Sequence, residues 1–146
     1  MDSNIYIRAF REAAFGVELQ DFHRLNLSRL VVSAVVASEL LVGAQKPDRE
    51  RAVVRTLVEP FRVRRRLITP SWSTWALAAT VDRAIRRQPA NRTRLAQRSF
   101  MQDILIAASA REIGATIITE NTADFTLIGR HIDIAFVLPW PPTPAA

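Results

Sequence analysis

The segment QDILIAASAREIGATIITENTADF, residues Gln102–Phe125, gives the most direct indication of the fold of this chain. An apolar helix is predicted over Leu95–Ile113, and it ends at Gly114, a residue type favoured just past a helix C-terminus. The β-branched segment Ala115–Thr119 then predicts a short buried strand. A polar loop begins directly after that strand. A helix, an apolar strand and a polar loop in this order are typical of a parallel α/β fold.

The rest of the chain continues this alternation. Further helices are predicted over Asn4–Ala14, Val17–Leu27, Ala37–Ala44 and Asp48–Leu57, and from a Ser71 cap to about Arg87. Further strands are predicted over Arg29–Val35, Arg66–Thr69 and Ile134–Leu138, and a loop over Gln88–Thr93. We therefore expect a single α/β domain over residues 1–146, with helices on both faces of a mostly parallel sheet and a proline-rich tail over 139–146.

Several classes of site are excluded by composition. The 146 residues contain no cysteine, which removes disulfides, thiolate zinc sites, iron–sulfur clusters and cysteine nucleophiles. His23 and His131 are the two histidines, so a site with several histidine ligands is excluded, and both are predicted to lie at the surface. The four glycines do not match a phosphate-binding loop, and no G-x-S-x-G segment is present.

Membrane and secretory signals are also missing from the sequence. The longest apolar run, Val31–Ala44, is too short to span a bilayer and contains Glu39. The chain opens with polar residues and shows no signal peptide. We therefore expect a soluble cytoplasmic protein with no membrane contact. Trp72 and Trp75 lie on one face of their predicted helix, where a place in the core is favoured over a base-stacking role.

Positive charge is concentrated in the middle of the chain. The net charge is +6, and residues 46–98 hold 14 basic and four acidic residues. The flanks together hold six basic and 10 acidic residues. A nucleic-acid enzyme has this distribution, with arginines on phosphates and carboxylates on a metal. A solvated arginine face on two helices gives the same distribution, so charge alone leaves both interpretations open.

Two acidic residues lie in unusually apolar helical segments. Glu39 is in SAVVASELLVGA and Asp103 is in FMQDILIAASA. An unpaired buried carboxylate costs several kcal/mol, so carboxylates are rarely buried unless they are paired or bind a metal. Either residue could instead lie at a helix edge and face water.

Two further polar residues stand at junctions between elements. Asn121 follows the strand Ala115–Thr119, at the end of a parallel strand where ligands bind. Asp2 begins the first helix, where a cap is the simpler role, and Asp124 is predicted to cap a turn over Phe125–Ile128. Asp2, Glu39, Asp103 and Asn121 could converge at one edge of the sheet. Oxygen ligands without histidine or cysteine select Mg²⁺ or Mn²⁺, whose chemistry suits hydrolysis of a nucleic acid.

The chain resembles the PIN domain family, and within it the VapC-type toxins of type II toxin–antitoxin pairs. The residues that carry the resemblance are DSNIYI at Asp2–Ile7, SAVVASELLVGA at Ser33–Ala44, the Gln102–Phe125 segment and PWP at Pro139–Pro141. They cover essentially the whole chain in order. The long third block is the specific one.

The resemblance implies a PIN-like three-layer α/β/α sandwich and an Mg²⁺- or Mn²⁺-dependent endoribonuclease. Such proteins cleave RNA, are usually homodimers and are inhibited by a small cognate antitoxin protein. Asp2, Glu39 and Asp103 match the three metal-binding acids of the family, and Asn121 matches a fourth position where the family has Asp or Asn. These four residues are the expected catalytic and metal-binding set.

The chain departs from the family at its first strand. PIN domains have an apolar strand before the first Asp, in the centre of the sheet, whereas only Met1 precedes Asp2 here. We expect the neighbouring strands to lose ladder partners. Either the true start lies upstream or this copy of the domain is degraded, and we favour the first because Glu39, Asp103 and Asn121 all persist. The alternative function is a catalytically inactive, arginine-rich module of the same fold that binds RNA or a protein.

Overall fold

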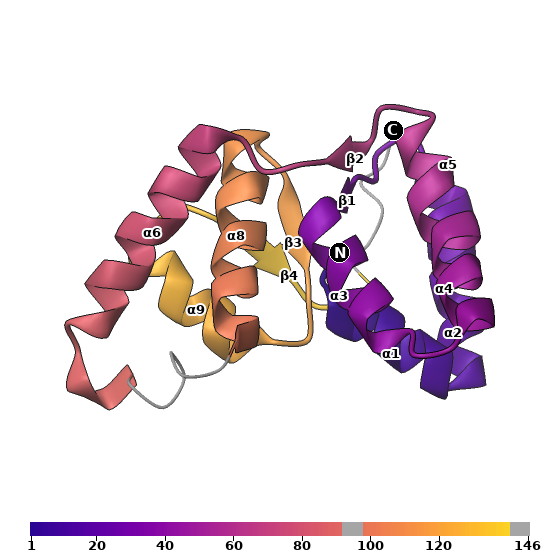
Figure 1. Cartoon of the computed structure of the whole chain (residues 1–146), viewed down its shortest axis with the longest axis horizontal. Helices are drawn as coiled ribbons and strands as arrows, with labels where there is room; N and C mark the ends of the chain where they lie inside the picture. Colours follow the sequence, from indigo (N-terminus) through magenta and orange to yellow (C-terminus); the bar gives the residue numbers. More distant parts are fainter. Residues whose placement is uncertain (92–97, 141–146) are drawn as a thin grey trace.

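The structure is a computed structural model that describes residues 1–91 and 98–140 (Figure 1). Its longer helices are α1 (Ser3–Arg11), α2 (Ala13–Asn26), α3 (Ala34–Gly43), α4 (Pro47–Val53), α6 (Trp72–Arg86), α8 (Arg98–Glu112) and α9 (Thr122–Gly129). Shorter helical pieces are η1 (Val54–Val58), α5 (Glu59–Arg62) and η2 (Pro89–Asn91). The strands are β1 (Val32–Ser33), β2 (Leu67–Ile68), β3 (Thr116–Ile118) and β4 (Ala135–Val137). The predicted alternation of helices and parallel strands is confirmed.

The described strands form two parallel pairs. In one pair Val32 of β1 lies opposite Leu67 of β2, and in the other Ile117 of β3 lies opposite Phe136 of β4. The backbone N–H of Asp2 donates to the carbonyl of Ile118, 2.9 Å away, on β3. The start of the chain therefore lies against β3.

The first two helices meet at Glu12 rather than at Gly16. The backbone of Glu12 is extended, with φ −118° and ψ 105°, and it separates α1 from α2. The boundary predicted at Gly16 is wrong because this glycine lies inside α2. A Cβ atom at Gly16 would come within 3.0 Å of the carbonyl oxygen of Ala9, so the glycine permits close packing of α2 on α1.

The helix that begins at Pro47 runs further than predicted. We expected it to end at Leu57, but α4, η1 and α5 continue without a break to Arg62. Pro60 lies inside this continuous run, at the second position of α5. A π-helical segment, Val54–Val58, precedes it. Beyond α6, the predicted loop and the start of the predicted Leu95–Ile113 helix lie partly outside the described residues.

Helices α6 and α8 pack together at the start of α6 (Figure 1). The Ser71 hydroxyl caps α6 by accepting from the N–H of Thr74, as predicted. Glu112, at the end of α8, accepts hydrogen bonds from the hydroxyls of Ser71, Ser73 and Thr74. One carboxylate thus joins the end of one helix to the start of the other.

The prediction that Trp72 and Trp75 lie in the core is wrong. Trp72 is 83% exposed and Trp75 is 46% exposed. The buried face of α6 is formed by Thr74, Ala78, Val81 and Ile85, which recur at helical spacing. This smaller, aliphatic face packs on the core and turns both indole rings outward.

The core surrounds α8, which is buried almost all round between Asp103 and Ala110. Its largest members include Phe61, Phe100, Ile104, Phe125 and Ile128. A helix that is apolar on all sides is typical of a central position. In the described part of the chain, no helix is long and apolar enough to cross a membrane.

The histidines are not the surface residues that we predicted. His23 is half-buried and lies edge-on to the rings of Tyr6 and Phe61, with centroids 5.9 Å and 5.8 Å away. Burial lowers the pKa of His23 to about 4, so its ring is neutral at pH 7. His131 is half-buried, with its Nε2 atom enclosed.

Candidate functional site

Asp2 lies at the junction of α1 and β3. It caps α1, because its Oδ1 accepts from the N–H of Ser3 at 2.7 Å. Its Oδ2 accepts from the Thr119 hydroxyl at 2.7 Å and from the Asn4 amide at 2.9 Å. The side chain is buried, and burial raises the pKa of Asp2 above its usual value although these hydrogen bonds oppose the change. The capping role predicted for Asp2 is therefore confirmed, and its second oxygen faces other polar groups.

Thr119, the residue after β3, links the start of the chain to the loop that carries Asn121. Its side chain is fully buried, at 0% exposure. The hydroxyl donates to Asp2, accepts from the backbone N–H of Asn121 at 2.9 Å, and contacts the Asn4 amide at 3.2 Å. One hydroxyl thus positions the first acidic residue and the loop that carries Asn121.

Asn121 caps α9 and holds two carboxylates. Its Nδ2 donates to Asp103 Oδ2 at 3.3 Å and to Asp124 Oδ2 at 2.9 Å, while its Oδ1 accepts from the N–H of Asp124 at 3.5 Å. The prediction that Asp124 caps this helix is wrong, because Asn121 takes the cap position and the helix begins at Thr122. Asp124 instead lies one helical turn from Asn121, beside the other acids.

Asp103 lies on α8 and is buried, with 7% exposure. It therefore does not face water at a helix edge. Burial raises the pKa of Asp103 to about 8, and the negative charges of Asp2, Asp124 and Glu39 add to the rise. The Asn121 amide joins Asp103 to Asp124, and the charges of Asp2 and Glu39 also reach Asp103, so the four carboxylates lie in one region. We call Asp2, Glu39, Asp103 and Asp124 the acid cluster.

Glu39 reaches the acid cluster from α3. It is half-buried, and burial raises the pKa of Glu39, with a further rise from the charge of Asp2 and an opposing effect of the Ser3 hydroxyl. Its Oε2 atom is buried and has no hydrogen-bond partner among the residues that the structure describes. A buried carboxylate oxygen without a donor is costly, so this atom is suited to a cation.

The structure thus brings Asp2, Glu39, Asp103 and Asn121 into one region. Sequence reasoning missed Ser3, Asn4, Thr119 and Asp124 as their neighbours. Two of these neighbours could have been identified from their positions. Thr119 stands at the end of the apolar strand, and Asp124 follows Asn121 by one helical turn. Nothing in the sequence pattern placed Ser3 or Asn4.

The donor set fits a hard divalent cation. Carboxylate and amide oxygens are the groups that Mg²⁺ and Mn²⁺ prefer, and the buried Glu39 oxygen lacks another partner. Within the described residues, 1–91 and 98–140, no three acidic or histidine side chains stand close enough together to form a complete ligand set. Burial, and after it the negative charges of Asp2, Asp124 and Glu39, raises the pKa of Asp103, and a bound cation would offset both effects.

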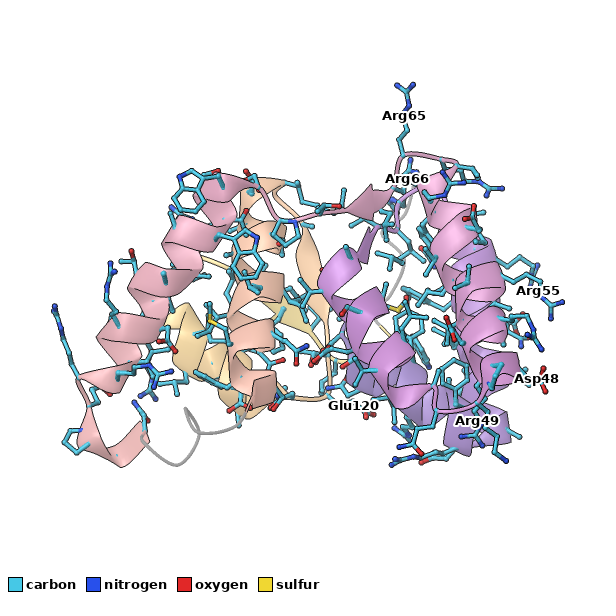
Figure 2. The ribbon with its side chains drawn as sticks, viewed as in Figure 1. Asp48, Arg49, Arg55, Arg65, Arg66 and Glu120 are labelled. Atoms are coloured by element: carbon cyan, nitrogen blue, oxygen red, sulfur yellow. The ribbon has the colours of Figure 1, made fainter. Side chains whose placement is uncertain are left out.

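An ion pair lies beside the acid cluster. Arg8 of α1 pairs with Glu120, at 2.5 Å, and with Glu12, at 2.9 Å. Glu120, labelled in Figure 2, lies between Thr119 and Asn121, so its ion pair with Arg8 joins α1 to the loop after β3. The loop is therefore held to α1 by an exposed ion pair and by the buried Thr119 hydroxyl.

Comparison with known proteins identifies relatives. The family model for the PIN domain matches residues 1–130. The tRNA(fMet)-specific endonuclease VapC of Shigella flexneri is 31% identical over 132 residues, which cover 88% of this chain and 90% of that protein.

Two solved structures share the fold. One is the structure of FitAB bound to an IR36 DNA fragment, with a TM-score of 0.68 and 18% identity over 97% of this chain and 95% of that one. The other is FitAcB from Neisseria gonorrhoeae, with a TM-score of 0.65 and 20% identity over 97% of each chain. At these identities, the likeness concerns the fold.

Proposed function

This chain belongs to the PIN domain family, among its VapC-like toxin–antitoxin nucleases, and we propose that it is a metal-dependent endoribonuclease, the toxin of its pair. The proposed reaction is hydrolysis of an RNA phosphodiester bond with Mg²⁺ or Mn²⁺. The similarity to an endonuclease named for a transfer RNA supports RNA as the substrate class.

The convergence of the acid cluster carries this proposal. Asp2 lies at the start of α1, Glu39 on α3 and Asp103 on α8, and burial together with the charges of Asp2, Asp124 and Glu39 raises the pKa of Asp103. A fold gains no stability from gathering carboxylates in a partly dry site. Perturbed carboxylates that meet at one place are characteristic of a functional site.

We assign roles to the residues as follows. The carboxylates of Asp2, Glu39 and Asp103 hold the cation. Asn121 orients Asp103 through its amide, at 3.3 Å, and completes the proposed catalytic and metal-binding set. A bound Mg²⁺ or Mn²⁺ supplies a Lewis acid for the phosphodiester oxygen and lowers the pKa of a water.

Two neighbouring residues support that arrangement. Thr119 fixes Asp2, because its hydroxyl donates to Oδ2 and leaves Oδ1 on the N–H of Ser3. Asp124 shares the Asn121 amide with Asp103. These contacts hold the carboxylates in place before any cation binds, which reduces the reorganisation that binding needs.

We also propose the partners and setting typical of such toxins. The chain would act in the cytoplasm as a homodimer and would be inhibited by a small cognate antitoxin. Sedimentation of the purified protein is expected to give twice the mass of 16.4 kDa. Coexpression with the protein from the adjacent reading frame is expected to give a stable complex without nuclease activity.

The decisive experiment compares RNA cleavage by the wild-type protein and by Asp103→Asn. The substitution keeps the size of the side chain and removes the charge that a cation requires. We expect cleavage with Mg²⁺ or Mn²⁺, none with EDTA, and a loss of at least about 100-fold in Asp103→Asn, since a missing metal ligand or its support typically costs 10–100-fold or more.

A matched control is Asp133→Asn, which makes the same change at an exposed position outside the acid cluster. It is expected to cleave like the wild type. Equal cleavage by Asp103→Asn would show that the activity comes from a contaminant. A folded wild-type protein that binds RNA without cleaving it, with either metal, would support the inactive binding module instead.

A further inference from the structure

An open groove lies between α1, α3 and α4, and Glu39 is the member of the acid cluster that lines it. It has a volume of about 410 Å³ and its lining includes Ile7, Phe10, Arg11, Glu39, Gly43 and Arg49. The three helices lie next to one another in the fold (Figure 1). Glu39 belongs both to the groove and to the acid cluster, so whatever fills the groove lies next to the proposed site of cleavage.

The groove has an apolar wall on α1. Ile7, Phe10 and Arg11 are three and four residues apart and share one face of the helix. Phe10 is 63% exposed, although a phenyl ring is normally buried. A Cβ atom at Gly43 would meet nothing within 4 Å, so the groove is open beside this residue of α3. A planar ring of a ligand therefore finds in the groove both an apolar surface to stack on and an open space to occupy.

The groove also has a positive rim. Arg11 and Arg49 are exposed and lie on α1 and α4. Within the described residues, neither side chain forms an ion pair, whereas Arg8, Arg51 and Arg62 each do. Figure 2 shows Arg49 at the same lower edge of the molecule as Glu120, far from Arg65 and Arg66 at the upper edge. These free cations favour an anionic occupant.

We propose that this groove binds the nucleotide next to the scissile phosphodiester of a single-stranded RNA, with its base stacked on Phe10 and its phosphates on Arg11 and Arg49. Exposed aromatic rings flanked by cations bind single strands because every base has a stacking face and every linkage a negative charge. The assignment rests on the proposed function for its substrate class. It identifies Phe10 as a positioning residue for substrate.

The test measures binding without cleavage. Single-stranded oligoribonucleotides that carry 2-aminopurine at one position are titrated with protein in EDTA, and both fluorescence anisotropy and 2-aminopurine emission are recorded. We expect emission to be quenched at one or two positions. Phe10→Ala is expected to lose that quench and to bind about 5- to 100-fold more weakly, while Phe10→Tyr keeps both properties.

The arginines are tested in the same assay. Arg11→Ala and Arg49→Ala are each expected to reduce the slope of log affinity against log salt by about 0.7, the value for one phosphate on a single strand. Gly43→Leu fills the groove without removing a contact and is also expected to weaken binding. The matched controls are Trp72→Ala, an exposed aromatic residue on α6, and Arg55→Ala, an exposed arginine beyond α4.

The outcomes separate this proposal from the proposed function. RNA binding and quenching that depend on Phe10, without any cleavage when metal is added, would support the groove and overturn the nuclease. Metal-dependent cleavage with the same affinity and emission in Phe10→Ala would overturn the groove alone. Loss of antitoxin binding in Phe10→Ala, with RNA binding unchanged, would assign the groove to the protein partner and also overturn it.

Discussion

Thr119 shows at the scale of one residue how the candidate site depends on a single hydroxyl. It is buried, it donates to Asp2 and it accepts from the N–H of Asn121. Thr119→Val keeps the shape and leaves both partners without their hydrogen bond. We expect a loss of about 1–3 kcal/mol in the free energy of unfolding, measured by urea denaturation.

Thr80→Val is the matched control for that substitution. On the exposed side of α6, the Thr80 hydroxyl donates to the carbonyl of Ala76 and accepts from Arg83 at 3.2 Å. Its replacement is expected to change stability by less than about 0.5 kcal/mol. Equal effects of the two substitutions would mean that the Thr119 hydroxyl contributes no more than a surface one.

Asp103 makes the stability of the metal-free protein depend on pH. Its pKa rises from an ordinary 3.8 to about 8 on folding. Between these values the folded chain keeps a proton that the unfolded chain has lost, so the free energy of unfolding falls as the pH rises from about 4 to about 8. Thermal unfolding in EDTA across this range is expected to show the decline.

Asp103→Asn removes the charge and is expected to flatten this decline. At pH 8 the variant should melt several degrees above the wild type, while below about pH 3 the two should be close, since Asp103 of the wild type is then protonated in both the folded and the unfolded state. Parallel curves would show that Asp103 ionises normally. Mn²⁺ is expected to stabilise the wild type more at pH 8 than at pH 5, because it competes with the proton.

The residues of the site were predictable only as candidates. Glu39 and Asp103 stood out because they interrupt apolar helices, and that signal comes from the cost of burying a charge. Asp124 did not stand out, since an Asp before an apolar turn is an ordinary helix cap. Asn121 took the cap because its amide can accept from the N–H of Asp124 and also donate to carboxylates, which an Asp cannot do.

Among the elements, the end of α8 offers a test of backbone conformation. Gly114 has φ +64° and Gly43 ends α3 without a positive φ, yet a Cβ atom would meet nothing within 4 Å at either position. Gly114→Ala is therefore expected to destabilise the protein by about 1 kcal/mol. Gly43→Ala, the matched control, is expected to be neutral or to stabilise by up to about 1 kcal/mol. Equal urea midpoints for Gly114→Ala and Gly43→Ala would contradict the expectation that the positive φ of Gly114 requires glycine.

The existence of the helices was predictable, but several boundaries were not. The sequence marks breaks with Gly and Pro, yet Gly16 lies inside α2 and Pro60 lies inside a continuous helical run. At Gly16 packing outweighs local preference, because a close helix contact needs this glycine. The prediction that Trp72 and Trp75 lie in the core was wrong for a related reason, since the size of a side chain alone does not decide which face of α6 is buried.

The arginines that Figure 2 labels lie at several edges rather than on one surface. Figure 2 shows Arg65 and Arg66 at the upper edge, Arg55 at the right and Arg49 at the lower edge. Arg51, Arg62 and Arg86 are paired with carboxylates on their own helices. Among the described residues, therefore, only part of the positive charge in the middle of the sequence is free to meet one RNA strand.

This distribution predicts a weak salt dependence of RNA binding. Two phosphate contacts, on Arg11 and Arg49, give a slope of about −1.4 in log affinity against log salt, at about −0.7 for each contact on a single strand. Anisotropy titrations in EDTA at several salt concentrations measure it. A slope near −7, which about 10 contacts would give, would mean that the strand wraps around the protein.

The convergence of the acid cluster is a property of the whole fold. The hydrogen bond between Thr119 and Asp2 joins residues 117 positions apart. Periodicity and capping patterns act over a few residues and contain no information about such contacts. The order of parallel strands brings distant loops to one edge, and resemblance to a known family supplied that order here.

The long sequence separation between residues of the site also means that they are added at different times during protein synthesis. Asp2 and Asn121 are 119 residues apart, an interval of about 6 to 24 s at about 5–20 residues per second on the ribosome. Glu39 is added 37 residues after Asp2, and from then until Asn121 is added the growing chain lacks the amide that holds Asp103. A translation product that stops before Thr119 lacks both the Thr119 hydroxyl that donates to Asp2 and the Glu120 carboxylate that pairs with Arg8.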